Sequence, residues 1–223
     1  MSIKLFFEAV LKFTLGLIIV GLLIFLPANT LKYWNGWLFM ALLFIPMFIV
    51  GIVMMIKDPN LLKSRLGARE KENEQKTVVF LSALMFIFGF IIAGLNYRFK
   101  WLQLSDVVII ISSIIFLLSY ILYAEVLREN AFLSRTIEVQ KEQKVIDFGL
   151  YGIVRHPMYF ATLFLFLSMP LILGSFISFI IFLVYPFIIA KRINNEEKVL
   201  EEQLKGYKEY KNKVKYKLIP FIW

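Results

Sequence analysis

The residues of this chain that could do chemistry gather in two short segments, Arg155–Tyr159 and Glu196–Glu197. The first contains a guanidinium, an imidazole and a phenol, and His156 is the only histidine among 223 residues. The second begins just after the long apolar stretch that starts at Pro157. These groups are suited to binding a polar small molecule and to moving a proton, so we interpret the two segments as one site.

The two acids also stand on the inward face of a predicted amphipathic helix that begins at Lys191. At 100° per residue its apolar side chains share one face, and both acids fall inside that arc. The apolar side chains are Ile193, Leu200, Leu204, Tyr207 and Val214. Inward charges are unfavourable unless they meet cations, donors or a ligand. Structural ion pairs with Arg155, Arg192 or nearby lysines are the alternative to a ligand-binding role.

His156 also has two interpretations. Pro157 disfavours a helical conformation in the residue before it and can itself begin a helix, which leaves the preceding side chains at the membrane surface. A lone histidine there is otherwise a hydrogen-bonded structural residue. Arg155 offers a planar fork for a carboxylate, although Arg155 and Tyr159 could each serve only as interfacial anchors. It is the combination that favours a site.

The composition is that of an integral membrane protein. Hydrophobic residues make up 60% of the chain and the mean hydropathy is +0.74, which is too apolar for a soluble domain of this size. A helix needs about 20 apolar residues to cross the hydrocarbon core. Four long uncharged runs meet that need, and because they are continuous rather than alternating they predict helices and not barrel strands. They are Phe13–Leu31, Tyr33–Ile56, Thr77–Tyr97 and Val107–Ala124.

A fifth uncharged run, Pro157–Ala190, would form a helix of about 50 Å, too long for one span and too short for two full ones. Pro170 and the pair Gly174–Ser175 supply a break. We therefore predict two short antiparallel helices, Tyr159–Met169 and Phe176–Ala190. The predicted fold class is an all-α integral membrane protein with about six transmembrane helices, the last two a short hairpin, and a cytoplasmic C-terminal helix.

The basic residues predict the orientation. If both termini lie on one side, 22 of the 25 Lys and Arg residues fall on that side. The positive-inside rule then places both termini and the histidine segment in the cytoplasm of a multi-pass cell-membrane protein. Attraction to the anionic lipid bilayer accounts for the net charge of +9, so no nucleic-acid partner is expected.

The rare residue types exclude several kinds of site. The chain has no cysteine, which excludes disulfides, thiolate metal sites and cysteine nucleophiles. One histidine excludes a multi-histidine centre, so we expect no metal ligand. No Rossmann glycine fingerprint occurs. The first apolar stretch lacks a clear cleavage site, and we interpret it as a retained helix.

The ordered motifs of the C-terminal part resemble the isoprenylcysteine carboxyl methyltransferase and phospholipid methyltransferase superfamily of membrane enzymes. They are Gly149–Tyr159, the hairpin, Glu196–Leu200, Gly206–Tyr210, Val214 and Leu218–Pro220. The resemblance implies S-adenosyl-L-methionine as cofactor and a lipophilic small-molecule, prenylated or lipid acceptor. It also implies a cofactor site lined or shaped by Tyr151, His156, Pro157, Tyr159, Glu196 and Glu197. Ala161 and Lys205 stand where the family often has glycine and phenylalanine.

In domain terms, the resemblance implies a four-helix transmembrane region at residues 1–127 and a cofactor-binding catalytic region at residues 128–223. The latter begins with a loop in which Gly149 and Gly152 permit either a tight backbone course near a ligand or an ordinary turn. It continues through the hairpin to the C-terminal helix.

The candidate catalytic residues are Arg155, His156 and Glu125. Methyl transfer from a sulfonium is an in-line displacement, so much of the rate can come from orienting donor and acceptor in a dry pocket. Arg155 and His156 suit the cofactor's carboxylate. An amine or thiol acceptor also needs a base, for which His156 and Glu125 are the candidates, whereas a carboxylate acceptor needs none. Glu125 is otherwise an interfacial charge.

Two other functions remain open. Membrane sterol reductases, which use NADPH, have a similar arginine-histidine-proline segment, but the two acids suit a cationic sulfonium amino acid better than a phosphate-rich dinucleotide. A non-enzymatic transporter or scaffold would be favoured by ionisable residues in mid-helix and by paired interrupted spans, and neither is evident. The acceptor itself is not predicted by the sequence.

Overall fold

The computed structural model describes residues 3–67, 73–133, 139–140 and 142–223, and the regular structure in these ranges is helical. The elements are α1 (Ile3–Ala28), α2 (Trp34–Lys57), α3 (Pro59–Leu66), α4 (Asn73–Phe99), α5 (Asp106–Glu129), a 3-10 turn η1 (Gly149–Gly152), α6 (Pro157–Ile172), α7 (Phe176–Phe182), α8 (Tyr185–Gln203) and α9 (Tyr207–Lys213). An isolated bridge joins Gln103 to Ser175. Residues 139–140 and 142–146 contain no helix or strand, and Lys141 lies outside the described residues.

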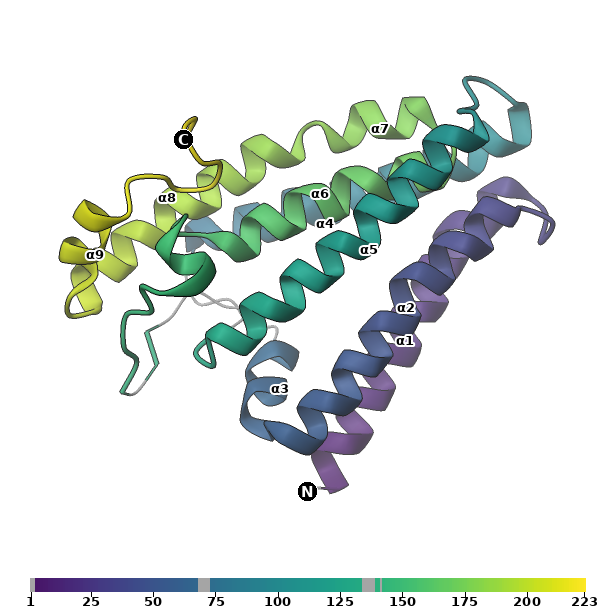
Figure 1. The fold of residues 1–223 in the computed structure, drawn as a ribbon. Coiled ribbons are helices and arrows are strands. Elements are labelled where there is room, and N and C mark those ends of the chain that lie inside the picture. The colour runs from purple at the N-terminus through teal and green to yellow at the C-terminus, as the bar shows by residue number, and fades with distance from the viewer. Residues whose placement is uncertain (1–2, 68–72, 134–138, 141) are drawn as a thin grey trace.

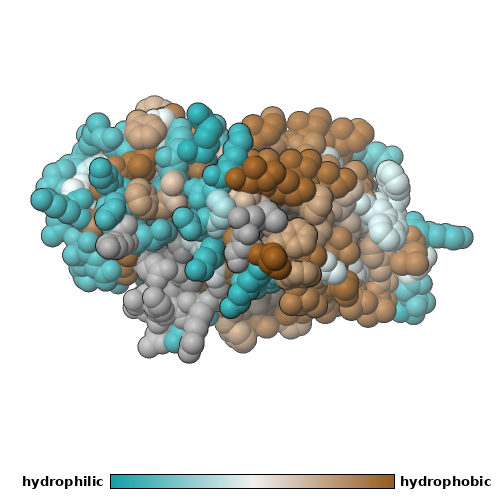
Figure 2. All heavy atoms as spheres, turned by 90° about the horizontal axis from the view of Figure 1, so that it is seen from below, coloured by the Kyte–Doolittle hydropathy of each residue, from teal (hydrophilic) through white to brown (hydrophobic). Residues whose placement is uncertain are grey.

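The described residues contain five helical stretches long and apolar enough to cross a membrane. This confirms the prediction of helices and is compatible with a membrane protein. The five stretches are Ile3–Ala28, Trp34–Lys57, Gln75–Phe99, Asp106–Glu129 and Phe176–Gln203, and α6 is a shorter apolar helix. On the face in Figure 2, hydrophobic side chains gather in a broad band between hydrophilic ends, as expected for a protein with a lipid-facing surface. Both termini lie at the same end of the helices (Figure 1).

The short helix α6 occupies the interior of the bundle. It packs against α5 and α7, and it buries apolar side chains along most of its length, among them Ala161, Leu165 and Ile172. The predicted break at Pro170 is wrong in detail, because that proline lies inside α6. A proline removes one main-chain hydrogen bond, and a tightly packed apolar helix tolerates this loss. The break predicted at the pair Gly174–Ser175 is confirmed: the chain turns at Leu173–Ser175, where the Ser175 hydroxyl accepts a hydrogen bond from the Ser178 N–H at 3.2 Å.

The C-terminal part differs from the prediction. We expected a membrane helix ending at Ala190 and a separate cytoplasmic helix from Lys191, but α8 is one continuous helix across that point. The single helical face predicted as far as Val214 is also wrong, because Gly206 separates α8 from α9 with φ +87°. That left-handed conformation favours glycine. It lets α9 fold back, so that its apolar side chains still reach those of α8.

The helix α3 was not predicted. Its carboxylate cap, Asp58, accepts a hydrogen bond from the Leu61 N–H at 3.0 Å, and Pro59 starts the first turn. Leu61 and Leu62 are buried, and the Lys12 ammonium donates to the Leu66 carbonyl at 2.8 Å. This helix therefore ties the end of α2 to the start of α1.

Candidate functional site

Arg155 and His156 lie in the short connection between η1 and α6. His156 has φ −127° and ψ 61°, and Pro157 is the first residue of the helix. A proline keeps the residue before it out of helical geometry, so α6 begins at Pro157. The main-chain N–H groups of Arg155 and His156 donate to the carbonyls of Tyr216 and Lys217, each at 2.9 Å. The segment after α9 is thereby fixed against the start of α6.

The side chains of Arg155 and Glu197 form a buried ion pair. Arg155 Nε donates to Glu197 Oε1 at 2.6 Å, and both side chains are only 4% exposed. Arg155 Nη1 also donates to the carbonyls of Val214 and Lys215 at 2.7 and 2.8 Å. These bonds satisfy a guanidinium that burial would otherwise destabilise. Glu197 therefore matches the structural ion pair that the sequence left open as an alternative.

His156 shares the same carboxylate. Its Nε2 lies 3.2 Å from Glu197 Oε1, and the Lys217 ammonium lies 3.3 Å from Oε2. An ionised carboxylate only accepts hydrogen bonds, so we assign the ring hydrogen to Nε2. In the neutral imidazole Nδ1 is then the nitrogen that can accept a proton or a donor hydrogen.

Glu196 has a different environment from its neighbour. The Tyr159 hydroxyl donates to Glu196 Oε2 at 2.5 Å, and Arg192 Nε donates to that hydroxyl oxygen at 2.9 Å. Within the described residues, this is the one hydrogen bond that the Glu196 carboxylate accepts. A carboxylate has about four acceptor sites, so most of its capacity is available to a ligand.

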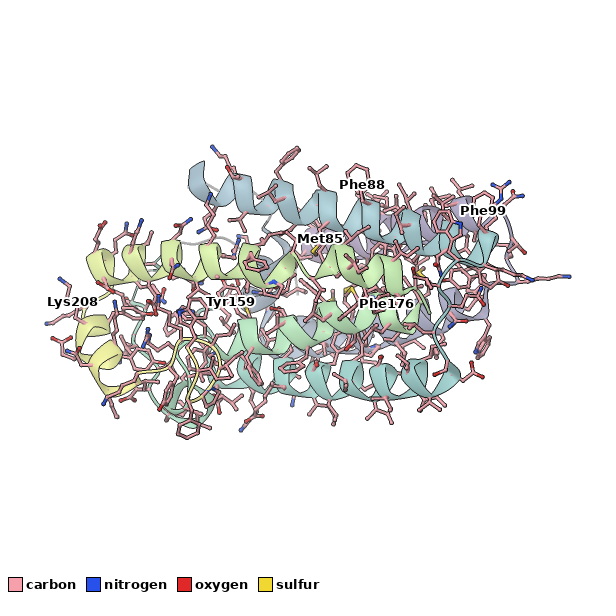
Figure 3. All side chains as sticks on the ribbon, turned by 90° about the horizontal axis from the view of Figure 1, so that it is seen from above. Met85, Phe88, Phe99, Tyr159, Phe176 and Lys208 are labelled. Atoms are coloured by element: carbon pink, nitrogen blue, oxygen red, sulfur yellow. The ribbon has the colours of Figure 1, made fainter. Side chains whose placement is uncertain are left out.

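A cavity of about 90 Å³ opens beside these groups. Tyr159 lies between α6 and α8, and Lys208 marks α9 at the outer end (Figure 3). The polar side of the cavity is formed by Arg155, His156, Tyr159, Arg192 and Glu196. The remaining wall is mostly apolar or aromatic and includes Phe132, Val145, Tyr151, Met158, Leu200, Leu204, Tyr207 and Tyr210.

Tyr151 is held at the cavity wall by residues on both sides of it. Asn130 Nδ2 donates to the Tyr151 hydroxyl at 3.1 Å, and the Tyr210 hydroxyl donates to the Tyr151 carbonyl at 2.7 Å. Burial raises the pKa of the Tyr151 phenol, so the group stays protonated at neutral pH. These contacts connect the end of α5, η1 and α9 in one wall.

Gly149 allows a close approach at the start of η1. The Glu129 carboxylate accepts a hydrogen bond from the Leu150 N–H at 2.9 Å, and a Cβ on Gly149 would lie 1.9 Å from Glu129 Oε1. Gly149 also has φ +58°, a conformation that favours glycine. The backbone at Gly149 therefore turns tightly, as one of the two alternatives from the sequence, and it does so around the Glu129 side chain of α5.

The structure brings together most of the predicted site residues. Tyr151, Arg155, His156, Tyr159 and Glu196 line the cavity, and Glu197 lies behind it in the ion pair. Pro157 is buried at the start of α6 and acts on the site through the backbone.

Glu125 is not part of this group. Its carboxylate accepts a hydrogen bond from Arg128 Nε at 2.8 Å on the protein surface, where the two side chains are 38% and 75% exposed. It does not line the cavity. The geometry therefore supports the interfacial charge that the sequence left open, and not a base.

Two residues of the site were not assigned a ligand-facing role from the sequence. Arg192 stands four residues before Glu196, a spacing that places both on one helix face and could have indicated it. Tyr207 was expected in an apolar core, yet it lines the cavity and is 4% exposed. No sequence signal distinguishes a packed tyrosine from one beside a ligand.

The comparisons with known proteins agree with this geometry. A search of curated proteins found no match. Residues 107–202 match the model of the isoprenylcysteine carboxyl methyltransferase family. The matched segment starts in the first turn of α5 and ends in the last turn of α8, so it contains the arginine-histidine-proline segment and both acids. Over residues 107–202, the chain is similar to the isoprenylcysteine carboxyl methyltransferase family.

Proposed function

We propose that this protein is an S-adenosyl-L-methionine-dependent methyltransferase that acts on a lipophilic or amphiphilic acceptor at the cytoplasmic membrane surface. The observation that carries the proposal is the Glu196 carboxylate, which faces a cavity at the polar end of apolar helices and accepts one hydrogen bond within the described residues. The similarity of residues 107–202 to the isoprenylcysteine carboxyl methyltransferase family supports a membrane methyltransferase.

The residues present fit this cofactor. Glu196 suits an ammonium group or ribose hydroxyls, because an ionised carboxylate forms strong bonds with both kinds of donor. The aromatic ring of Tyr151 at the cavity wall suits a sulfonium cation. Glu197 contributes no free charge to the cavity, since Arg155, His156 and Lys217 already surround it.

When bound, S-adenosyl-L-methionine supplies an electrophilic methyl group. The protein's own task is then to orient the acceptor and to keep water out. His156 Nδ1 is the atom that would accept a proton from an amine or thiol acceptor, and Glu197 fixes the ring in the orientation that leaves this nitrogen available. Because Arg155 donates from Nε and Nη1 to Glu197 and two carbonyls, we assign it to positioning rather than to contact with a reacting atom.

The acceptor class follows from where the cavity lies. Its lining includes Tyr207 and Tyr210 of α9 and His156 before α6. These elements lie at the end of the helices that carries both termini (Figure 1), and the distribution of basic residues predicts that this end is cytoplasmic. Phe132, Leu133 and Met158 line it beside the apolar helices α5 and α6. An acceptor with an apolar chain in the bilayer and a reactive group at the surface suits this position.

Binding measurements on the purified protein in detergent test the proposal. We expect S-adenosyl-L-methionine to bind, and Glu196→Gln to weaken it about tenfold or more, the usual effect of losing a hydrogen bond to a charged group. Glu202→Gln makes the same chemical change at an exposed position of α8 and serves as the control. A protein that binds NADPH and not S-adenosyl-L-methionine would be a reductase, and the proposal would be wrong.

The acceptor is then sought with a methyl-labelled donor and a total lipid extract. Label should move into an extractable lipid or prenylated compound in the presence of the wild-type protein. A comparable transfer by a His156→Ala variant would exclude an imidazole base and favour an acceptor that is already anionic.

A further inference from the structure

Tyr207 is a buried phenol that has no hydrogen-bond partner among the residues that the structure describes. Its residue is 4% exposed, and its hydroxyl oxygen finds no donor or acceptor in the described part of the chain. The neighbouring hydroxyls of Tyr151, Tyr159 and Tyr210 each have one. Buried hydroxyls are almost always hydrogen-bonded, so this exception calls for an explanation.

The position of Tyr207 points to the cavity. The residue begins α9, it lines the cavity, and it packs with Leu204, Tyr210 and Val214 in an apolar cluster. Leu204 and Tyr210 also line the cavity, as do Leu200 and Val145 beside them. The orphaned hydroxyl therefore belongs to a largely apolar wall, and such a wall suits a flat heteroaromatic ring.

The charges around Tyr207 limit what its hydroxyl can bind. Burial raises the pKa of the phenol, and the negative charges of Glu197 and Glu196 raise it further. The group is thus an O–H donor at neutral pH. The Glu196 carboxylate, which also lines the cavity, disfavours an anionic acceptor, and this leaves a neutral nitrogen or oxygen as the partner.

This inference rests on the proposed function. We propose that the Tyr207 hydroxyl donates a hydrogen bond to a ring nitrogen of the adenine base, and that the base lies against the wall formed by Leu204 and Tyr210. Glu196 is then left to the ammonium or ribose end of the same molecule. Tyr207 lies outside the residues matched by the family, so the match does not assign it a role.

Tyr207→Phe tests the proposal because it should move two measurements in opposite directions. Without ligand, the variant should unfold at the same temperature as the wild type or higher, since it loses a buried hydroxyl that has no partner. Its affinity for S-adenosylhomocysteine should nevertheless fall about two- to tenfold. Tyr210→Phe is the matched control: it breaks the bond to the Tyr151 carbonyl and should lower the unfolding temperature.

Deaza analogues of S-adenosylhomocysteine locate the contact. In the 1-, 3- and 7-deaza compounds one ring nitrogen is replaced by C–H. One of them should bind the wild type more weakly by the factor that Tyr207→Phe causes, and should lose nothing more in the variant.

Several results would overturn the proposal. These are a lowered unfolding temperature for ligand-free Tyr207→Phe, an unchanged affinity for S-adenosylhomocysteine, or a loss that no deaza analogue reproduces. If the wild-type protein binds S-adenosylhomocysteine, each of these results would contradict the role of Tyr207 and leave the proposed function unaffected. A wild-type protein that does not bind it refutes both.

Discussion

Replacing either of the neighbouring acids Glu196 and Glu197 by glutamine should have a different effect: the change at Glu197 should lower the stability of the protein, and the change at Glu196 should lower its affinity for the ligand. Glu197→Gln keeps the shape of the side chain but leaves the Arg155 guanidinium, 4% exposed, without its counter-charge. Removing one partner of a buried ion pair typically destabilises a protein by about 3–5 kcal/mol. The amide oxygen can still accept from Arg155, so we expect the lower end, about 3 kcal/mol. Glu196→Gln should reduce stability by less than about 1 kcal/mol, because Tyr159 can still donate to the amide oxygen.

The assay is unfolding of both variants in one detergent, by heat or by titration with a denaturing detergent, with ligand binding measured in parallel. Glu197→Gln should lose stability first and affinity only as a consequence, whereas Glu196→Gln should lose affinity in a folded protein. Adding Arg155→Met to Glu197→Gln should be less harmful than the sum of the two single effects, since the uncompensated charge is gone. A Glu197→Gln protein as stable as the wild type would refute this account of the ion pair, as would equal destabilisation by both single substitutions.

Three further predictions concern the surroundings of the site. Gly149→Ala should destabilise the protein by at least about 1 kcal/mol in a thermal unfolding assay, because φ is +58° and the new methyl group meets the carboxylate that caps η1; unchanged stability would contradict the required conformation. The hydrogen bond from Lys213 lowers the pKa of the Asp147 carboxyl, so this pair stabilises the folded protein above the carboxyl's ordinary pKa of about 3.9 and loses that effect as the pH falls through the lower folded-state pKa. The difference in unfolding free energy between wild type and Asp147→Asn should therefore shrink as the pH falls over that range. A difference that grows as the pH falls would contradict the lowered pKa. Because the chain has no cysteine, the variants Lys208→Cys and Lys100→Cys would each carry a single thiol. In sealed right-side-out membranes an impermeant maleimide should label the Lys100→Cys variant and leave the Lys208→Cys variant unlabelled. The opposite pattern would show that the predicted orientation is wrong.

The membrane helices could be predicted well because hydropathy depends on local sequence. The runs Thr77–Tyr97 and Val107–Ala124 lie within α4 and α5, and only the ends of the helices were missed. The short helix α3 could not be predicted in the same way, since its mixed basic and apolar residues are helical because of a cap and of contacts with α1 and α2.

The site was predicted in its residue types but not in their partners. The helical wheel correctly turned Glu196 and Glu197 inward, yet it could not show that Glu197 meets Arg155 while Glu196 meets Tyr159. Those partners come from the turn before α6, within α6, and the segment after α9, so they depend on long-range packing. The wheel also assumed one straight helix through Gly206, where the chain changes direction.

The hydrogen bonds from Arg155 to the carbonyls of Val214 and Lys215 have a consequence for biosynthesis. These carbonyls come after every membrane helix in the chain, so α1 to α8 leave the ribosome before them. Membrane insertion therefore precedes completion of the site. A nascent chain would pass through a stage in which its helices are in the bilayer while the guanidinium still lacks two of its acceptors, and during that stage quality-control proteases would meet an inserted but incompletely folded protein.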